Sequence, residues 1–106
     1  MTEPNYVQRI GDRLTVLLPG CDADLIRLYT LLALEFGTQT DLCMIHNAWS
    51  VWKNATDPTH KSLIPFPFLS PAVQELDRKY MEAVHAVVEA DYAALVAERG
   101  AEKAAS

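Results

Sequence analysis

The sequence predicts an all-α fold, a compact bundle of about four helices with a long ordered Pro- and Phe-rich loop before the last helix. Apolar side chains recur at three- and four-residue steps along most of the chain, the spacing that lines one face of a helix. No segment has a convincing strand pattern, and no segment is repeated. The 106 residues, half of them hydrophobic, suit a single domain with one core. We expect that domain over residues 1–100 and a frayed tail over residues 101–106.

Two helices, separated by the stop signal Pro19 and Gly20, are predicted in the N-terminal part of the chain. The first covers residues 6–18 and carries on one face four apolar side chains: Tyr6, Ile10, Leu14 and Leu17. The second covers residues 23–36, begins after the capping residue Asp22 and is apolar nearly all round. Three of its side chains lie off its main apolar face: Ile26, Leu31 and Leu34. A four-helix monomer leaves them uncovered, so we expect a homodimer or a protein partner at this helix.

A third helix and a structured loop are predicted next. The helix, over residues 41–53, has one apolar seam: Leu42, Ile45, Trp49 and Trp52. Residues 54–69 show no periodicity and contain three of the six prolines, which fix the chain locally. Four large apolar side chains make this segment too apolar to leave in water: Leu63, Ile64, Phe66 and Phe68. We therefore expect an ordered loop that packs on the domain and buries these four side chains.

The last predicted helix is long and begins at Ser70 and Pro71. Serine is a favoured capping residue, and proline is favoured at the first helical position. One face then continues through five apolar positions: Val73, Leu76, Tyr80, Val84 and Val87.

Charge and composition limit the classes of partner. Nine basic and fourteen acidic residues give a formal charge of −5, which disfavours binding to duplex nucleic acid. The apolar runs of the chain, such as residues 31–34, are far shorter than the ~20 residues needed to cross a bilayer, so no membrane partner is expected. The N-terminal sequence has no basic segment leading into an apolar one, and two cysteines make no disulfide framework. We expect a cytoplasmic protein.

The residues that would support catalysis or metal binding are sparse. No nucleophile stands at a recognisable spacing from a base, and there is no glycine-rich phosphate loop. We therefore expect no enzymatic activity and no cofactor. Four residues have side chains of the kinds that bind zinc, but they lack the close paired spacing of zinc motifs: Cys43, His46, Asp57 and His60. No metal site is predicted.

Three groups of residues occur in a characteristic order in the middle of the chain. His46 and Trp49 share a helix, the loop follows with a second group, and the Asp77–Arg78 pair opens the last helix. The second group consists of His60, Leu63, Ile64, Pro65, Phe66 and Leu69. In this order the residues over 41–88 resemble a RyR domain, the small helical module repeated in ryanodine receptors and found in bacterial and phage proteins. The chain also resembles small proteins of actinobacteria and their phages.

The chain departs from the RyR pattern at two places. Lys61 stands where the family usually has proline, and the family's Gly-Trp-x-Tyr-Gly hairpin is missing. The resemblance implies a nucleotide-related ligand, because a pair of these modules in ryanodine receptors is associated with adenine nucleotides. Bacterial members are suspected of sensing nucleotide-derived signals.

Eight residues are candidates for ligand binding: His46, Trp49, Lys53, His60, Lys61, Pro65, Phe66 and Arg78. Trp49 and Trp52 either stack on a ligand ring or belong to the core, because they share the helical seam. His46 either donates a hydrogen bond to a ligand or caps a loop carbonyl and holds the Pro65 segment in place. The basic residues, together with Lys79, bracket the loop and either hold phosphates or remain solvated.

The preferred interpretation is a non-enzymatic, RyR-like binding module that recognises a nucleotide or a nucleotide-derived small molecule. Its pocket is predicted between the third helix, the Pro- and Phe-rich loop and the start of the fourth helix. The alternative interpretation is a phage-encoded protein-interaction module that acts on a host protein through the second helix. A homodimer through that helix is compatible with either interpretation.

Overall fold

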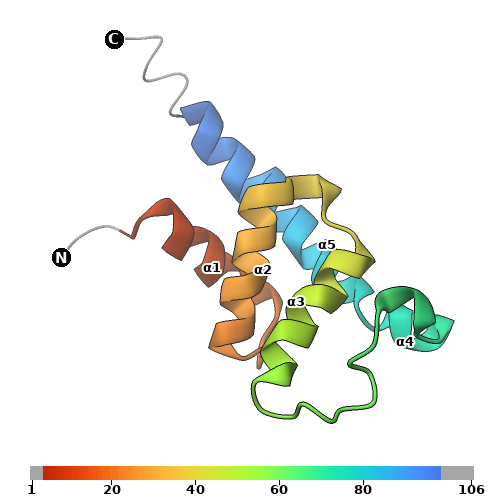
Figure 1. Ribbon diagram of the computed structural model, residues 1–106. Helices are drawn as coiled ribbons and strands as arrows, with labels where there is room; N and C mark the ends of the chain where they lie inside the picture. Colours follow the sequence, from red (N-terminus) through yellow and green to blue (C-terminus); the bar gives the residue numbers. More distant parts are fainter. Residues whose placement is uncertain (1–3, 99–106) are drawn as a thin grey trace.

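The computed structural model describes residues 4–98, and all regular structure in that range is helical, which confirms the all-α prediction (Figure 1). Four longer helices form the bundle: α1 (Tyr6–Leu17), α2 (Ala23–Phe36), α3 (Leu42–Asn54) and α5 (Arg78–Val87). Shorter elements lie between and after them: η1 (Gly37–Gln39), η2 (Phe66–Phe68), α4 (Pro71–Glu75) and the π-helical turn η3 (Val88–Tyr92). The predicted tail, residues 101–106, lies outside the described range. No helix within that range is long and apolar enough to cross a membrane.

The helix starts follow from capping side chains. Asn5 accepts a hydrogen bond from the Gln8 backbone, and the Gln8 side chain accepts one from the Asn5 backbone, which completes a capping box at α1. Asp22 caps α2, Asp41 caps α3, and Ser70 caps α4 with Pro71 in its first turn. Each cap satisfies a backbone donor that the helix itself cannot pair.

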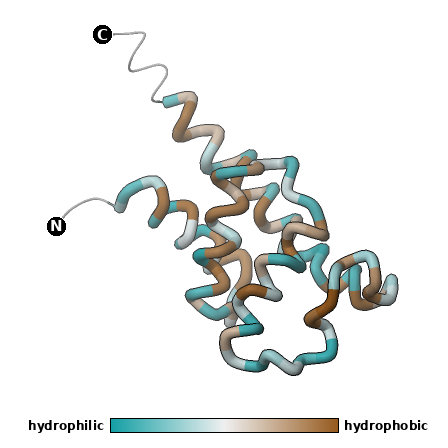
Figure 2. Tube along the Cα trace, viewed as in Figure 1, coloured by the Kyte–Doolittle hydropathy of each residue, from teal (hydrophilic) through white to brown (hydrophobic). Residues whose placement is uncertain are grey.

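One core collects residues from all four longer helices. Six of its side chains are almost fully buried: Ile10 and Leu14 from α1, Tyr29 from α2, Ile45 from α3, and Val84 and Val87 from α5. Burial of each aliphatic side chain contributes roughly 1.5 to 3 kcal/mol. Figure 2 shows the hydrophobic stretches of α2 running through the middle of this bundle.

Helix α2 exposes less apolar surface than predicted. Ile26 is buried and Leu34 packs against the core, so the prediction that both lie uncovered is wrong. The reason is that α2 contacts α1, α3 and α5, and three neighbours cover more than one face. Leu31 alone of the three is exposed, at 54%.

The predicted long final helix is broken at Leu76 and Asp77. Backbone hydrogen bonds run there from Leu76 to Val73 and from Asp77 to Gln74, the tighter three-residue pattern, and the chain turns between α4 and α5 (Figure 1). The Gln74 side chain donates to the carbonyls of Phe66 and Leu69, at 3.1 and 3.2 Å, which ties α4 to the loop. Leu76 is consequently 68% exposed and does not continue the apolar face.

The loop before α4 has a defined path, although two of its apolar side chains stay in solvent. Leu63 and Phe66 are half-buried and Leu69 is buried. Ile64 and Phe68 are exposed, Phe68 at 75%, so the predicted burial of all four large side chains is wrong for these two. Turn hydrogen bonds and contacts to α3, rather than full burial, hold this segment.

Candidate functional site

His46 connects α3 to the loop. Its ring is 3% exposed, and its Nε2 lies 2.7 Å from the carbonyl oxygen of Ile64. A carbonyl oxygen only accepts hydrogen bonds, so Nε2 carries the proton and donates it. The hydroxyl of Ser50 lies 3.3 Å from the same nitrogen. The structure therefore confirms the interpretation that His46 caps a loop carbonyl next to Pro65.

Four aromatic rings gather around this contact, and we call them the aromatic cluster: His46, Trp49, His60 and Phe66. The His46 ring stacks on Trp49 with centroids 5.7 Å apart and meets Phe66 at 6.1 Å. The edge contact between Trp49 and His60 has a centroid distance of 5.1 Å. These separations suit aromatic pairs, which prefer offset or edge-to-face arrangements. Residues from α3 and the loop, far apart in sequence, thus form one wall.

A pocket of about 370 Å³, which we call the aromatic pocket, opens beside the aromatic cluster. From α3 and the loop it is lined by His46, Trp49, His60 and Ser62. The rest of the lining comes from the chain around the break between α4 and α5: Val73, Leu76, Asp77, Lys79 and Tyr80. The volume falls within the range of about 300 to 1,000 Å³ typical of small-molecule sites. Leu76 and Asp77, which contribute to this lining, lie at the turn between α4 and α5.

The polar groups of the pocket have defined hydrogen-bonding roles. The backbone N–H of Ser62 donates to Nδ1 of His60 at 3.0 Å, so the neutral His60 ring carries its proton on Nε2 and can donate from there. Lys79 places its ammonium group 4.9 Å from the centre of the Tyr80 ring. Burial raises the pKa of the Asp77 carboxyl above its usual range, and the nearby His46 lowers it in part. The pocket thus combines donors, one carboxyl group and aromatic faces.

Three of the eight predicted ligand-binding residues line this pocket, namely His46, Trp49 and His60. The other five lie outside its lining: Lys53, Lys61, Pro65, Phe66 and Arg78.

The five candidate residues outside the pocket lining have other surroundings. Lys53 lies over the Trp52 ring at 5.6 Å, and Arg78 makes two hydrogen bonds to Glu75, at 2.7 and 3.1 Å. Phe66 packs against His46 behind the pocket, while Lys61 and Pro65 are exposed. Trp52 donates from Nε1 to Asp22 at 3.1 Å and joins α3 to the start of α2.

None of the five lining residues around the break between α4 and α5 was among the eight ligand-binding candidates, although Lys79 was named with the basic residues that could hold phosphates. Lys79, rather than its neighbour Arg78, supplies the cationic group there. Tyr80 appeared only as a core position, and Asp77 only as part of a motif. Their shared location depends on the turn at Leu76, which apolar periodicity does not reveal.

The structure shows no metal-binding cluster between residues 4 and 98, where no three His, Cys, Asp or Glu side chains gather to hold an ion. The two cysteines, Cys21 and Cys43, are unpaired. Burial raises the pKa of the Cys21 thiol, which disfavours its reactive thiolate form.

The fold and the pocket define a small all-helical domain with an aromatic, partly charged binding pocket. The chain belongs to the DUF7701 family, described as a domain of unknown function, whose profile matches residues 5–89. That range includes every residue that lines the aromatic pocket. No curated protein and no solved structure gave a significant match. The resemblance to RyR domains stays a prediction.

Proposed function

We propose that this protein is a non-enzymatic, RyR-like binding module whose pocket takes a nucleotide or a nucleotide-derived small molecule. The observation that carries the proposal is that Trp49 and Tyr80 line one pocket together with His60, Asp77 and Lys79. This combination of aromatic surface, donors and an acceptor suits a planar base that carries an anionic group.

The aromatic side chains favour a ring-shaped ligand. Stacking on an aromatic side chain contributes about 1 to 3 kcal/mol per base and tolerates different bases. Trp49 is half-buried and held by His46 and His60, so its orientation is fixed before a ligand arrives. A fixed ring loses little entropy when it stacks.

The polar side chains favour a ligand that has both an anionic group and N–H donors. Lys79 and the Nε2–H of His60 suit phosphate oxygens, as charge-assisted and neutral donors. The Asp77 carboxylate suits the amino or ring N–H groups of a base, because an ionised carboxylate only accepts hydrogen bonds. The proposed orientation places the base against Trp49 and Asp77 and the phosphate near Lys79.

A calorimetric screen tests the proposal with nucleoside monophosphates, dinucleotides and cyclic oligonucleotides. Saturable binding is expected for at least one of them, and Lys79→Ala should weaken it by about 1.5 to 3 kcal/mol through the lost charge-assisted contact. Lys61→Ala is the matched control, because Lys61 is an exposed lysine outside the pocket lining. Equal losses in both variants, or no binding in the whole screen, would contradict the proposal.

A protein-interaction module, phage-encoded and acting on a host protein, is the second candidate function. Exposed apolar side chains favour it: Phe68 in the loop, Leu76 in the pocket lining and Leu31 on α2. A homodimer through the same surfaces is compatible with both proposals. Light scattering over a concentration series, with Leu31→Glu and Phe68→Ser as variants, distinguishes self-association from a monomer.

A further inference from the structure

Among the residues that the structure describes, Asp77 supplies the only carboxylate in the lining of the aromatic pocket. It stands at the N-cap position of α5, where an aspartate usually accepts a hydrogen bond from the backbone of the first turn. Asp41 does so at α3, but the Asp77 side chain makes no such bond. Over residues 4–98 the Asp77 carboxylate accepts no hydrogen bond and pairs with no cation. Its two oxygen atoms are therefore available to a ligand.

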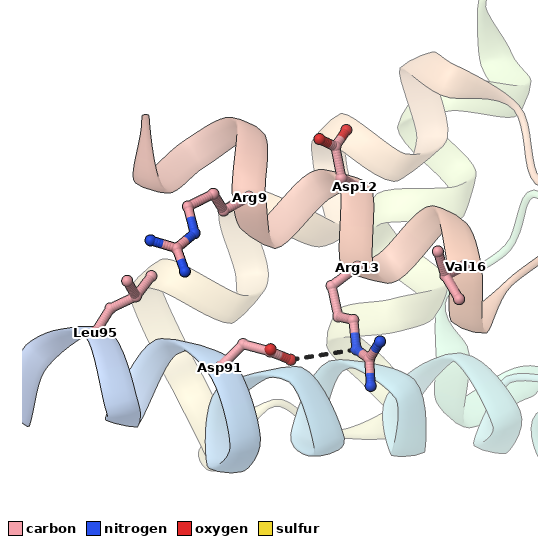
Figure 3. Close-up of a pocket in the computed structure, with 6 residues that line it drawn as sticks. All are labelled: Arg9, Asp12, Arg13, Val16, Asp91 and Leu95. Carbon is pink, nitrogen blue, oxygen red and sulfur yellow. Dashed lines mark ion pairs between the residues drawn. The ribbon is translucent and has the colours of Figure 1, made fainter. Parts of the chain in front are cut away.

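A second pocket, of about 290 Å³, holds a half-buried aspartate that does have a partner. This pocket lies between α1 and the C-terminal helical segment and shares no residue with the aromatic pocket (Figure 3). The Asp91 carboxylate forms an ion pair there with Arg13, with Oδ2 3.5 Å from Nε. Arg9 and Asp12 also line this pocket, so its positive and negative side chains balance. Asp77 has no such counterpart at hydrogen-bonding or ion-pair distance in the described chain.

The Asp77 carboxylate has lost part of its water without gaining a donor in return. Burial raises the pKa of this carboxyl group, because partial removal from water favours the neutral form, and the nearby His46 lowers it in part. Lys79 lines the same pocket, but its ammonium group rests over the Tyr80 ring, 4.9 Å from the ring centre. A ligand that donates hydrogen bonds to Asp77 would replace the lost water.

The shape of a carboxylate determines which base it pairs with best. An ionised carboxylate only accepts hydrogen bonds, and its two oxygen atoms match two N–H groups that lie side by side, as in its pairing with a guanidinium group. Guanine carries such a pair on its Watson–Crick edge, namely N1–H and the 2-amino group. Adenine and cytosine carry a ring acceptor beside their amino group, and the lone pair of that acceptor repels a carboxylate oxygen. Uracil has a single ring N–H between two carbonyl groups.

We propose that the aromatic pocket selects guanine among the nucleotide bases, with the Asp77 carboxylate accepting hydrogen bonds from N1–H and the 2-amino group. This inference rests on the proposed function, because it requires a nucleotide in the pocket. The guanine ring then stacks on Trp49, and the phosphate lies near Lys79. Ser62 also lines the pocket, and its hydroxyl group suits O6 of guanine, which is an acceptor.

Calorimetric titration of the full chain with matched ligands tests the proposal. GMP is compared with AMP, and cyclic di-GMP with cyclic di-AMP, because the members of each pair differ only in the base. At least one guanine ligand should bind at least about tenfold more tightly than its adenine counterpart, whose base places an acceptor opposite the carboxylate. IMP, which lacks the 2-amino group, should bind more weakly than GMP. This comparison of ligands needs no variant of the protein.

Two outcomes of these titrations would overturn the proposal, and they differ in what they leave. Equal affinity for the guanine and adenine ligands, with Lys79→Ala still weakening both, would remove guanine selection and leave the nucleotide proposal standing. The absence of binding by every nucleotide in the screen would overturn both proposals.

Asp77→Asn should change the base preference rather than simply weaken binding. An asparagine side chain presents one acceptor beside one donor, which matches N1–H and the neighbouring C2 carbonyl of xanthine. The variant should therefore bind xanthosine monophosphate more tightly, and GMP more weakly, than the wild type does. Glu82→Gln is the matched control, because it removes the same charge from an exposed position of α5 outside the pocket lining. Cooperative thermal melting shows that each variant is folded. An unchanged ratio of the two affinities in Asp77→Asn would overturn the proposal.

Discussion

Nε2 of His46 donates a hydrogen bond to the carbonyl oxygen of Ile64, 18 residues further along the chain and 2.7 Å away. This contact joins α3 to a loop that has little regular structure and keeps the His60 and Ser62 side of the aromatic pocket in place. Because Ile64 itself is exposed, its backbone rather than its side chain is the point of attachment. The existence of the pocket therefore depends on a buried imidazole.

Removal of the His46 ring should destabilise the protein and loosen the loop. His46→Ala deletes the donor and the stacking contacts with Trp49 and Phe66, so we expect a loss of about 2 to 4 kcal/mol in the free energy of unfolding. His46→Gln is the matched variant, because its amide can still donate toward the carbonyl. Urea unfolding measures the loss, and hydrogen exchange should increase at Leu63. Equal destabilisation by both substitutions would show that this hydrogen bond contributes little.

The two phenylalanines of the loop should differ in their effect on stability. Phe66→Ala removes a half-buried ring that contacts His46 and should cost about 1 to 3 kcal/mol, below the 3 to 5 of a fully buried ring. Phe68→Ala alters an exposed side chain and should change the free energy of unfolding by less than about 0.5 kcal/mol. Denaturant titrations of both variants give the comparison, and a large loss in Phe68→Ala would mean that this ring is covered in solution.

Substitutions on α2 should change the free energy of unfolding by different amounts at its buried and its exposed positions. Ile26→Ala opens a cavity in the core and should cost about 2 to 4 kcal/mol, whereas Leu31→Glu should leave the stability of the monomer nearly unchanged. If a homodimer forms through α2, Leu31→Glu should also lower the molar mass measured by light scattering. A monomer in both the wild type and Leu31→Glu would remove the homodimer from consideration.

Asp77 should make the stability depend on pH. Burial raises its pKa in the folded state above the value of the unfolded chain, so the folded state favours the protonated form. The contribution of Asp77 to the free energy of unfolding is fully present below the pKa of the unfolded chain, near 3.9. It is lost as the pH rises through the higher pKa of the folded state. Asp77→Asn keeps a neutral side chain, so its stability relative to the wild type should increase between acidic and neutral pH. Unfolding measured across this range checks the sign, and a relative stability that falls with rising pH would contradict it.

The repeating apolar positions were sufficient to predict the bundle. Tyr29, Ile45 and Val84 all lie where three- and four-residue spacing places them, because burial of an amphipathic face decides helix formation. The same spacing could not reveal the turn at Leu76, since a tight three-residue turn interrupts the helix without a proline or glycine to mark it.

The details of the pocket could not be predicted for the same reason. Adjacent residues on a helix point about 100° apart, so the orientation of Lys79 into the pocket and of Arg78 toward Glu75 depends on where α5 begins. The exposure of Phe68 likewise follows from how far the loop extends from the bundle, which hydropathy alone does not determine. The hydrogen bond from His46 to a loop carbonyl was one of two alternatives predicted for this side chain, the other being a hydrogen bond to a ligand.

Tryptophan fluorescence tests the central claim, that the aromatic pocket binds a nucleotide, most directly. The chain contains two tryptophans, and only Trp49 lines the pocket, while Trp52 is held by Asp22. In Trp52→Phe, whose remaining tryptophan is Trp49, titration with each of the nucleoside monophosphates, dinucleotides and cyclic oligonucleotides should give saturable quenching for at least one. The same ligand should leave the emission of Trp49→Phe unchanged. Quenching that persists in Trp49→Phe, or no saturable change in Trp52→Phe with any of these ligands, would contradict the account.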